Sequence, residues 1–138
     1  MNKNEIKEKY INAFFPNLTD KDKKEIYFKD YMWHAFSYNK VSHLEKKAAV
    51  KAFNKRRKND VYIFFQRDKK ILEFKNLTYK KLLNKMKKEK LESDCYIVDK
   101  NFEWTFVFTH EAIQNTHYWW QFPKHFFYIG PFFKSISN

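Results

Sequence analysis

His110 and Glu111 stand where a predicted strand ends, and of all neighbouring pairs in the sequence they are best suited to acid–base chemistry. A histidine beside a carboxylate can exchange a proton at neutral pH, and the end of a rigid strand holds such groups in place. Adjacent residues of a strand point to opposite faces, however, and the position of Glu111 favours a cap for a following helix. The pair is therefore a catalytic candidate without a complete catalytic frame around it.

Other patterns that carry chemistry are missing from the sequence. The spacing of His110, His117 and His125 fits neither a helical metal-binding pair nor a zinc pattern. With Gly130 as the single glycine, a glycine-rich phosphate loop is excluded. The single cysteine, Cys95, lies in an apolar run and is expected to be a buried small hydrophobe. We therefore expect no metal ion and no cofactor.

Lysines recur at helical spacing on two predicted helices. One set lies on a helix expected at residues 42–57, and the other on a helix expected at 78–91. The first set is Lys47, Lys51, Lys55, Arg56 and Lys58, and the second is Lys81, Lys85 and Lys88. Such stripes favour contacts with phosphates or acidic proteins, although a solvated helix face has the same pattern. The stripes can merge if both helices lie on the same side of a sheet.

Aromatic side chains crowd into residues 118–133. Most of them are expected to fill the core, since the chain has few leucines. Trp119 and Trp120 differ, because consecutive residues cannot both face one core. One of the two is expected near the surface, where an exposed tryptophan is a common interface anchor.

The formal net charge of +12 arises from 28 basic and 16 acidic side chains. Lysine far outnumbers arginine, and a genome of low G+C content would enrich lysine together with Asn, Ile, Phe and Tyr. Whatever its origin, this charge attracts anions and steers their approach. The basic residues are concentrated in the first hundred positions, whereas the aromatic C-terminal segment is close to neutral.

Periodicity and capping signals predict the elements that position these residues. Helices are expected at 4–14, 42–57 (with Ser42 as N-cap and Glu45 completing a capping box), 78–91 and 110–119. Strands are expected at 61–66, 71–74, 95–99, 104–109 and 126–129, and residues 29–37 suit either type. The length of 138 residues indicates one domain covering residues 1–138. The expected fold is α+β, a small mainly antiparallel sheet with helices packed on one face.

Several segments taken together resemble an uncharacterised family of small single-domain proteins from Bacillus and related Firmicutes. The segments are 33–37, Leu44 with Ala48, 52–53, 61–64, 99–107, 109–111 and 130–133. The resemblance implies a bacterial or phage protein of the cytoplasm, a class that often includes immunity, antitoxin and counter-defence factors. It implies no known activity.

Binding is favoured over catalysis, because no catalytic frame is complete. The main hypothesis is a non-catalytic binding protein of the cytoplasm, which engages an acidic protein or nucleic acid without inserting into a membrane. One alternative is a nucleic-acid-binding protein that uses the lysine stripes. Another is a nucleotide-binding or small hydrolytic enzyme with a site around His110 and Glu111. The sequence leaves the oligomeric state open.

Overall fold

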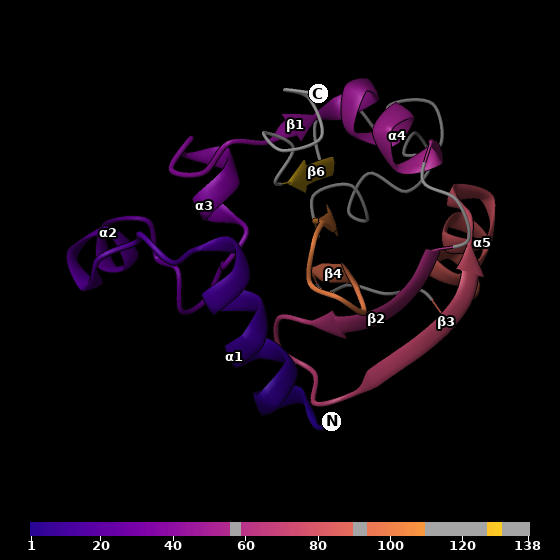
Figure 1. Cartoon of the computed structure of the whole chain (residues 1–138), viewed down its shortest axis with the longest axis horizontal. Helices are drawn as coiled ribbons and strands as arrows, with labels where there is room; N and C mark the ends of the chain where they lie inside the picture. The colour runs from indigo at the N-terminus through magenta and orange to yellow at the C-terminus, as the bar shows by residue number, and fades with distance from the viewer. Residues whose placement is uncertain (56–58, 90–93, 110–126, 131–138) are drawn as a thin grey trace.

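The computed structural model describes residues 1–55, 59–89, 94–109 and 127–130 (Figure 1). Its helices are α1 (Lys3–Phe14), α2 (Asp20–Glu25), α3 (His34–Ser37), α4 (Lys46–Asn54) and α5 (Tyr79–Glu89). Its strands are β1 (Leu44–Glu45), β2 (Asn59–Phe65), β3 (Ile71–Leu77), β4 (Cys95–Asp99), β5 (Thr105–Phe108) and β6 (Phe127–Gly130).

In this part of the chain the strands form one sheet with the order β1-β6-β5-β4-β2-β3, and all neighbouring strands are antiparallel. The hairpins β2–β3 and β4–β5 are formed by neighbouring strands that the sequence predicts, at 61–66 and 71–74 and at 95–99 and 104–109. They lie side by side because β2 pairs with β4, with Ile63 opposite Ile97. The α+β class and the antiparallel sheet are thus confirmed.

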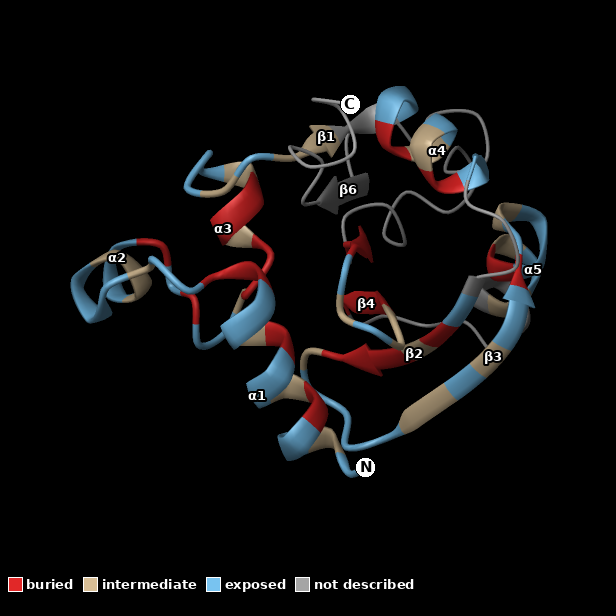
Figure 2. Cartoon of the chain, in the orientation of Figure 1, coloured by how far each residue is buried: buried red, intermediate tan, exposed pale blue. Residues whose placement is uncertain are grey.

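The helices cover both faces of the sheet, not one face as expected. Alternate residues of β2 divide between two separate cores, with Ile63 under α4 and α5 and Phe64 under α1 and α3. In β4, Ile97 and Tyr96 divide in the same way. Both strands are apolar on both faces, so each face needs a helical cover. Figure 2 shows the buried residues of α1 and α4 approaching the strands from different sides.

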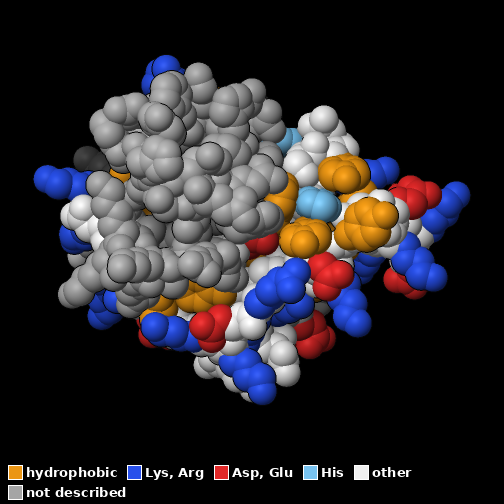
Figure 3. Space-filling model, turned by 180° about the vertical axis from the view of Figure 1, so that it is seen from behind, with side chains coloured by type: hydrophobic (Ala, Val, Ile, Leu, Met, Phe, Trp, Pro, Cys, Tyr) orange, Lys and Arg blue, Asp and Glu red, His pale blue; other side chains and the backbone are white. Residues whose placement is uncertain are grey.

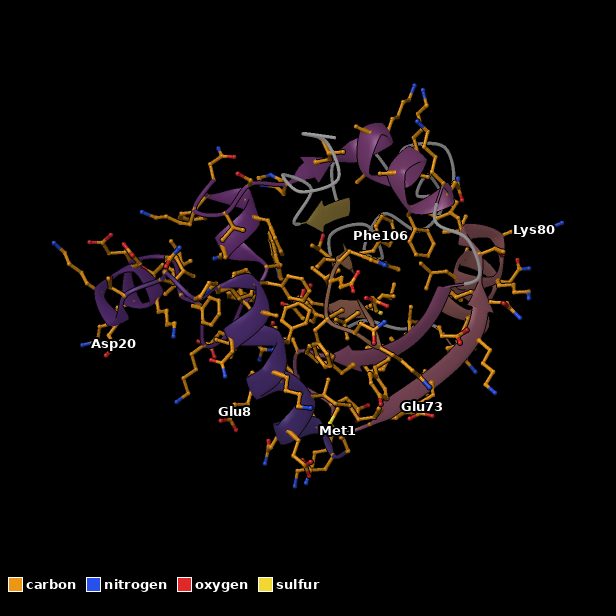
Figure 4. All side chains as sticks on the ribbon, in the orientation of Figure 1. Met1, Glu8, Asp20, Glu73, Lys80 and Phe106 are labelled. Atoms are coloured by element: carbon orange, nitrogen blue, oxygen red, sulfur yellow. The ribbon has the colours of Figure 1, made fainter. Side chains whose placement is uncertain are left out.

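Aromatic contacts hold each layer to the sheet. On the α4 side, the ring of Phe53 stacks on Phe106 with 4.5 Å between centroids. Phe106 lies inside the molecule, between the strands and α4 (Figure 4). On the other side, the ring of Tyr10 in α1 meets Phe64 edge-on at 5.2 Å. The core is therefore aromatic on both faces of the sheet.

The predicted helix start at Ser42 is wrong. Leu44 and Glu45 form the short strand β1, which pairs with Ile129 and Tyr128 of β6, and α4 begins only at Lys46. The backbone groups of this segment bond across the sheet, so the capping box does not form. A long-range strand pairing has overridden a local helix signal.

The helices predicted at 4–14 and 78–91 are confirmed as α1 and α5. Helix α1 ends at Phe14, two residues before Pro16. Thr78 caps α5 by accepting a hydrogen bond of 3.2 Å from the backbone N–H of Lys81. Helix α2, which the sequence reading missed, begins with a capping box between Thr19 and Asp22. The helix predicted at 110–119 lies outside the described residues.

Candidate functional site

Three lysines line one exposed face of α4, as their spacing predicts. Lys47, Lys51 and Lys55 are exposed, whereas Ala49 and Phe53 on the inner face are buried. We call these three lysines the α4 lysine face. Among the described residues, no carboxylate forms an ion pair with any of them. Their positive charge therefore remains available to a partner.

The α4 lysine face borders an open hollow of about 370 Å³. Val50, which is half-buried, and Asn54 complete its lining. The lysines come from successive turns, about 6 Å apart along the helix axis. The hollow thus combines a row of positive charges with a small apolar floor.

The lysines of α5 do not belong to this hollow, although α5 covers the same face of the sheet. The Lys81 Nζ atom donates a hydrogen bond of 3.4 Å to the carbonyl oxygen of Asn76, at the end of β3. The Lys85 Nζ atom lies 6.0 Å from the centre of the Phe74 ring, also on β3. Lys80 points away from the molecule on the same side (Figure 4). Lys81 and Lys85 therefore contact β3, a strand at the edge of the sheet.

The other candidates from the sequence lie outside the part that the structure describes. They are His110, Glu111, Arg56, Lys58, Trp119, Trp120 and the side chain of Lys88. The acid–base hypothesis therefore stays a prediction. In the described residues, no three His, Cys, Asp or Glu side chains are grouped to hold a metal ion.

A buried polar network ties the loop before α3 to the sheet, and sequence reasoning missed it. Gln66 follows β2, and its side-chain oxygen accepts hydrogen bonds from the Tyr96 hydroxyl and, at 3.0 Å, from the Met32 backbone N–H. The Tyr96 hydroxyl also accepts a bond of 2.9 Å from the backbone N–H of Trp33. Burial, together with the charge of nearby Asp94, raises the pKa of Tyr96 well above its usual range. The network positions the segment that contains Met32 and Trp33.

Residues on either side of Met32 and Trp33 form an aromatic stack at the surface, which we call the aromatic ladder: Tyr31, His34 and Tyr38. The His34 ring stacks on Tyr31 and on Tyr38, with 5.0 Å between centroids in each pair and interplanar angles of 28° and 20°. The Nδ1 atom of His34 lies 2.6 Å from the carbonyl oxygen of Ile26. A carbonyl only accepts, so Nδ1 carries a proton, and this bond fixes the imidazole plane.

A second hollow, of about 480 Å³, lies between α1 and the region around α2. We call it the lysine hollow. Four lysines line it together with two aspartates, and the other lining residues are apolar or aromatic. They are Lys7, Lys23, Lys24 and Lys29, with Asp20 and Asp30, and Ile11, Tyr27 and Phe28. The lining therefore carries a positive balance beside an aromatic surface.

The sequence contains a signal for these surfaces. Tyr27, Tyr31, His34 and Tyr38 follow at intervals of four, three and four residues, which is a helical stripe. The apolar residues between these positions, among them Trp33 and Phe36, are buried, so the stripe forms the outer side of the segment. Tyr27 and Tyr38 are, with Met1, the exposed large hydrophobic side chains of the described residues.

No helix in the described part of the chain has the length and apolar character needed to cross a bilayer. Residues 3–119 match the model of a family described as "Domain of unknown function (DUF4275)". This match confirms the resemblance to an uncharacterised family. No curated protein and no solved structure matches the chain.

Proposed function

The chain belongs to the family described as domain of unknown function DUF4275, and from that premise we propose that it is a non-catalytic binding protein whose α4 lysine face docks an acidic partner protein. The observation that carries this proposal is the row of Lys47, Lys51 and Lys55 along an open hollow, without an ion pair to any described residue. We expect the docking to take place in the cytoplasm, where a single buried cysteine is in keeping with a reducing environment.

The shape of the hollow favours a protein over a nucleic acid. Successive lysines one turn apart suit carboxylates one turn apart on an acidic helix. Val50 offers an apolar contact between the charges, which a phosphate backbone would not use. Lysine also gives point charges and not the bidentate pattern with which arginine reads bases. Neutralisation of a toxin or of a host defence protein is one role that such docking would serve.

Capture from a host lysate under two matched charge reversals tests the proposal. One full-length variant carries Lys47→Glu, Lys51→Glu and Lys55→Glu. The control carries Lys9→Glu, Lys69→Glu and Lys75→Glu, which change the net charge equally at exposed positions away from α4. Capture is compared with and without nuclease treatment of the lysate, and at low and high salt. Circular dichroism checks that both variants are folded.

We expect wild type and control to retain the same acidic protein, and the α4 variant to bind it at least about tenfold more weakly. Retention of that protein by the α4 variant would overturn the proposal. Loss of all captured material after nuclease treatment would show that the partner is a nucleic acid and not an acidic protein. The hypothesis of an enzyme around His110 and Glu111 stands apart, since both residues lie outside the described part of the chain.

A further inference from the structure

The face of the molecule opposite α4 carries an ordered aromatic surface. Within the aromatic ladder, the backbone N–H of each member bonds to the carbonyl of the preceding one: His34 to Tyr31 and Tyr38 to His34, each at 2.9 Å. The same pattern continues from Tyr31 back to Tyr27 at 2.9 Å. Together with the bond from His34 Nδ1 to the Ile26 carbonyl, these contacts hold the rings in place before any ligand arrives.

One end of the ladder is open. Tyr38 stacks on His34 with one face, and half of the residue, 50%, remains exposed. At the other end, the Arg67 guanidinium lies 5.6 Å from the centre of the Tyr31 ring. Because the stack ends on an exposed ring face, a planar group of a ligand can stack on that face as its next member. Figure 3 shows a histidine among hydrophobic side chains on the side of the molecule that carries α2 and α3, with charged side chains around them.

The lysine hollow adjoins this surface through Tyr27. Tyr27 is 64% exposed, it lines the hollow, and its carbonyl binds the N–H of Tyr31 in the ladder. The four lysines of the hollow outnumber its two aspartates, Asp20 and Asp30. In the described residues, none of the four lysines forms an ion pair. An anionic group can therefore bind in the hollow next to an exposed ring.

We propose that this face binds single-stranded nucleic acid, with bases stacked on Tyr38 and Tyr27 and phosphates held in the lysine hollow. Stacking platforms beside a positive groove are how proteins bind single strands without reading their sequence. A duplex buries its base faces and cannot use the rings. The length of the ladder separates Tyr38 from the hollow, so several linked nucleotides fit this surface better than one.

A protein partner fits this face less well. Apart from Met1, the exposed large hydrophobic side chains of the described residues are the two tyrosines, and none is Leu, Ile or Val. The core of a protein interface ordinarily contains apolar side chains of several kinds. The proposal goes beyond the docking function of α4, since it concerns the opposite face of the sheet and a different class of partner.

Fluorescence anisotropy of labelled oligonucleotides with the full-length protein tests this inference. The probes are oligodeoxythymidylate, oligouridylate, a DNA duplex of the same length and a mononucleotide. The variants are Tyr38→Ala and Tyr27→Gly, of which the second removes a ring at a backbone position that suits glycine. Lys24→Glu in the hollow is matched by Lys51→Glu on α4, which changes the net charge equally.

We expect each tyrosine variant to weaken single-strand binding at least about fivefold. We expect Lys24→Glu to weaken it more than Lys51→Glu, and the duplex and the mononucleotide to bind more weakly than either single strand. Affinity should fall with salt as several phosphate contacts are lost.

The proposal is wrong if neither single strand binds, or if both tyrosine variants bind like wild type. If Lys24→Glu and Lys51→Glu lose equal affinity for single strands, or if the duplex binds as tightly as the single strands, the binding is only attraction by net charge. If Tyr38→Ala loses a protein from the lysate capture but keeps its oligonucleotide affinity, the ladder is a protein interface. The α4 proposal fails when the α4 variant still captures the acidic protein, and this one fails when the tyrosine variants still bind single strands, so the two proposals fail separately.

Discussion

The indole Nε1 of Trp33 donates a hydrogen bond of 2.7 Å to the carboxylate of Asp94, and both side chains are buried. The bond joins the loop before α3 to the start of β4 across 61 positions of sequence. A buried carboxylate that loses a donor retains the cost of its desolvation. This contact therefore fixes the layer of α1–α3, and with it the aromatic ladder, against the sheet.

Replacing Trp33 by phenylalanine should lower the free energy of unfolding by about 2 kcal/mol or more, because Asp94 loses a charge-assisted bond. Urea unfolding followed by circular dichroism measures the change. In the Asp94→Asn background, the same replacement should cost less, since no buried charge is deprived of its donor. Equal costs in the two backgrounds would show that Trp33 contributes through packing alone.

Locally encoded elements could be predicted from the sequence. Helices α1 and α5 and the hairpins β2–β3 and β4–β5 follow from periodicity, caps and short turns between neighbouring segments. The exposed row of Lys47, Lys51 and Lys55 follows from the helical period alone. These features depend on interactions within a few residues, and a pattern in the chain is enough to specify them.

Features set by distant contacts could not be predicted. Leu44 adopts a strand because Ile129 pairs with it from the far end of the chain. The division of the helices between two faces depends on which residues of β2 face α1, and no local pattern shows that. Only the fold brings Gln66 and Tyr96 against the backbone of Met32 and Trp33. That network exposes the ladder while it buries the residues between its members.

A second buried network predicts an order of stabilities. The Thr105 hydroxyl donates a bond of 2.7 Å to the Ile97 carbonyl, so the Tyr10 hydroxyl, 2.7 Å away, must donate to Thr105. Tyr10→Phe removes one donor and should cost about 1 kcal/mol. Thr105→Val should cost more, about 2 kcal/mol, because it deprives both the Tyr10 hydroxyl and the Ile97 carbonyl of a partner. Chemical denaturation of the two variants checks the order, and the reverse order would contradict this relay.

Stability should fall at alkaline pH. Burial, reinforced by nearby Asp94, raises the pKa of the Cys95 thiol above its ordinary value of 9.0. Burial also raises the pKa of Tyr79 to about 12 from 10.0. Since the folded state keeps these protons longer, the stabilisation is complete below the unfolded-state pKa and is lost as pH rises.

Between pH 9 and pH 10, Cys95 alone should lower the free energy of unfolding by about 1 kcal/mol, because the thiol of the unfolded chain goes from about half to about nine-tenths ionised while the folded thiol stays protonated. Urea unfolding across this range in wild type and Cys95→Ala tests the effect, and the variant should show a shallower slope. An identical slope in both proteins would mean that Cys95 ionises alike in the folded and unfolded chains. Because the slopes of unfolding free energy against pH are compared, the pH-independent loss of stability caused by the smaller alanine side chain does not affect the result.

Tyr27→Gly should stabilise the protein while it weakens the proposed nucleic-acid site. Tyr27 follows α2 with a φ angle of 57°, and the bonds from Phe28 N–H to the Lys23 carbonyl and from Tyr27 N–H to the Lys24 carbonyl close the helix in a Schellman motif. Glycine is the usual residue at this position, because the side chain of any other residue destabilises the left-handed backbone conformation. We expect a gain of up to about 1 kcal/mol in the free energy of unfolding, measured by thermal or urea unfolding, after the greater chain entropy of glycine is subtracted.

Asn39→Gly is the matched control. Asn39 has the same φ angle of 57°, but asparagine tolerates this conformation better, so the stability should rise less. A loss of stability in Tyr27→Gly would mean that the ring stabilises the fold, whereas a gain would indicate that the strained, exposed tyrosine serves binding.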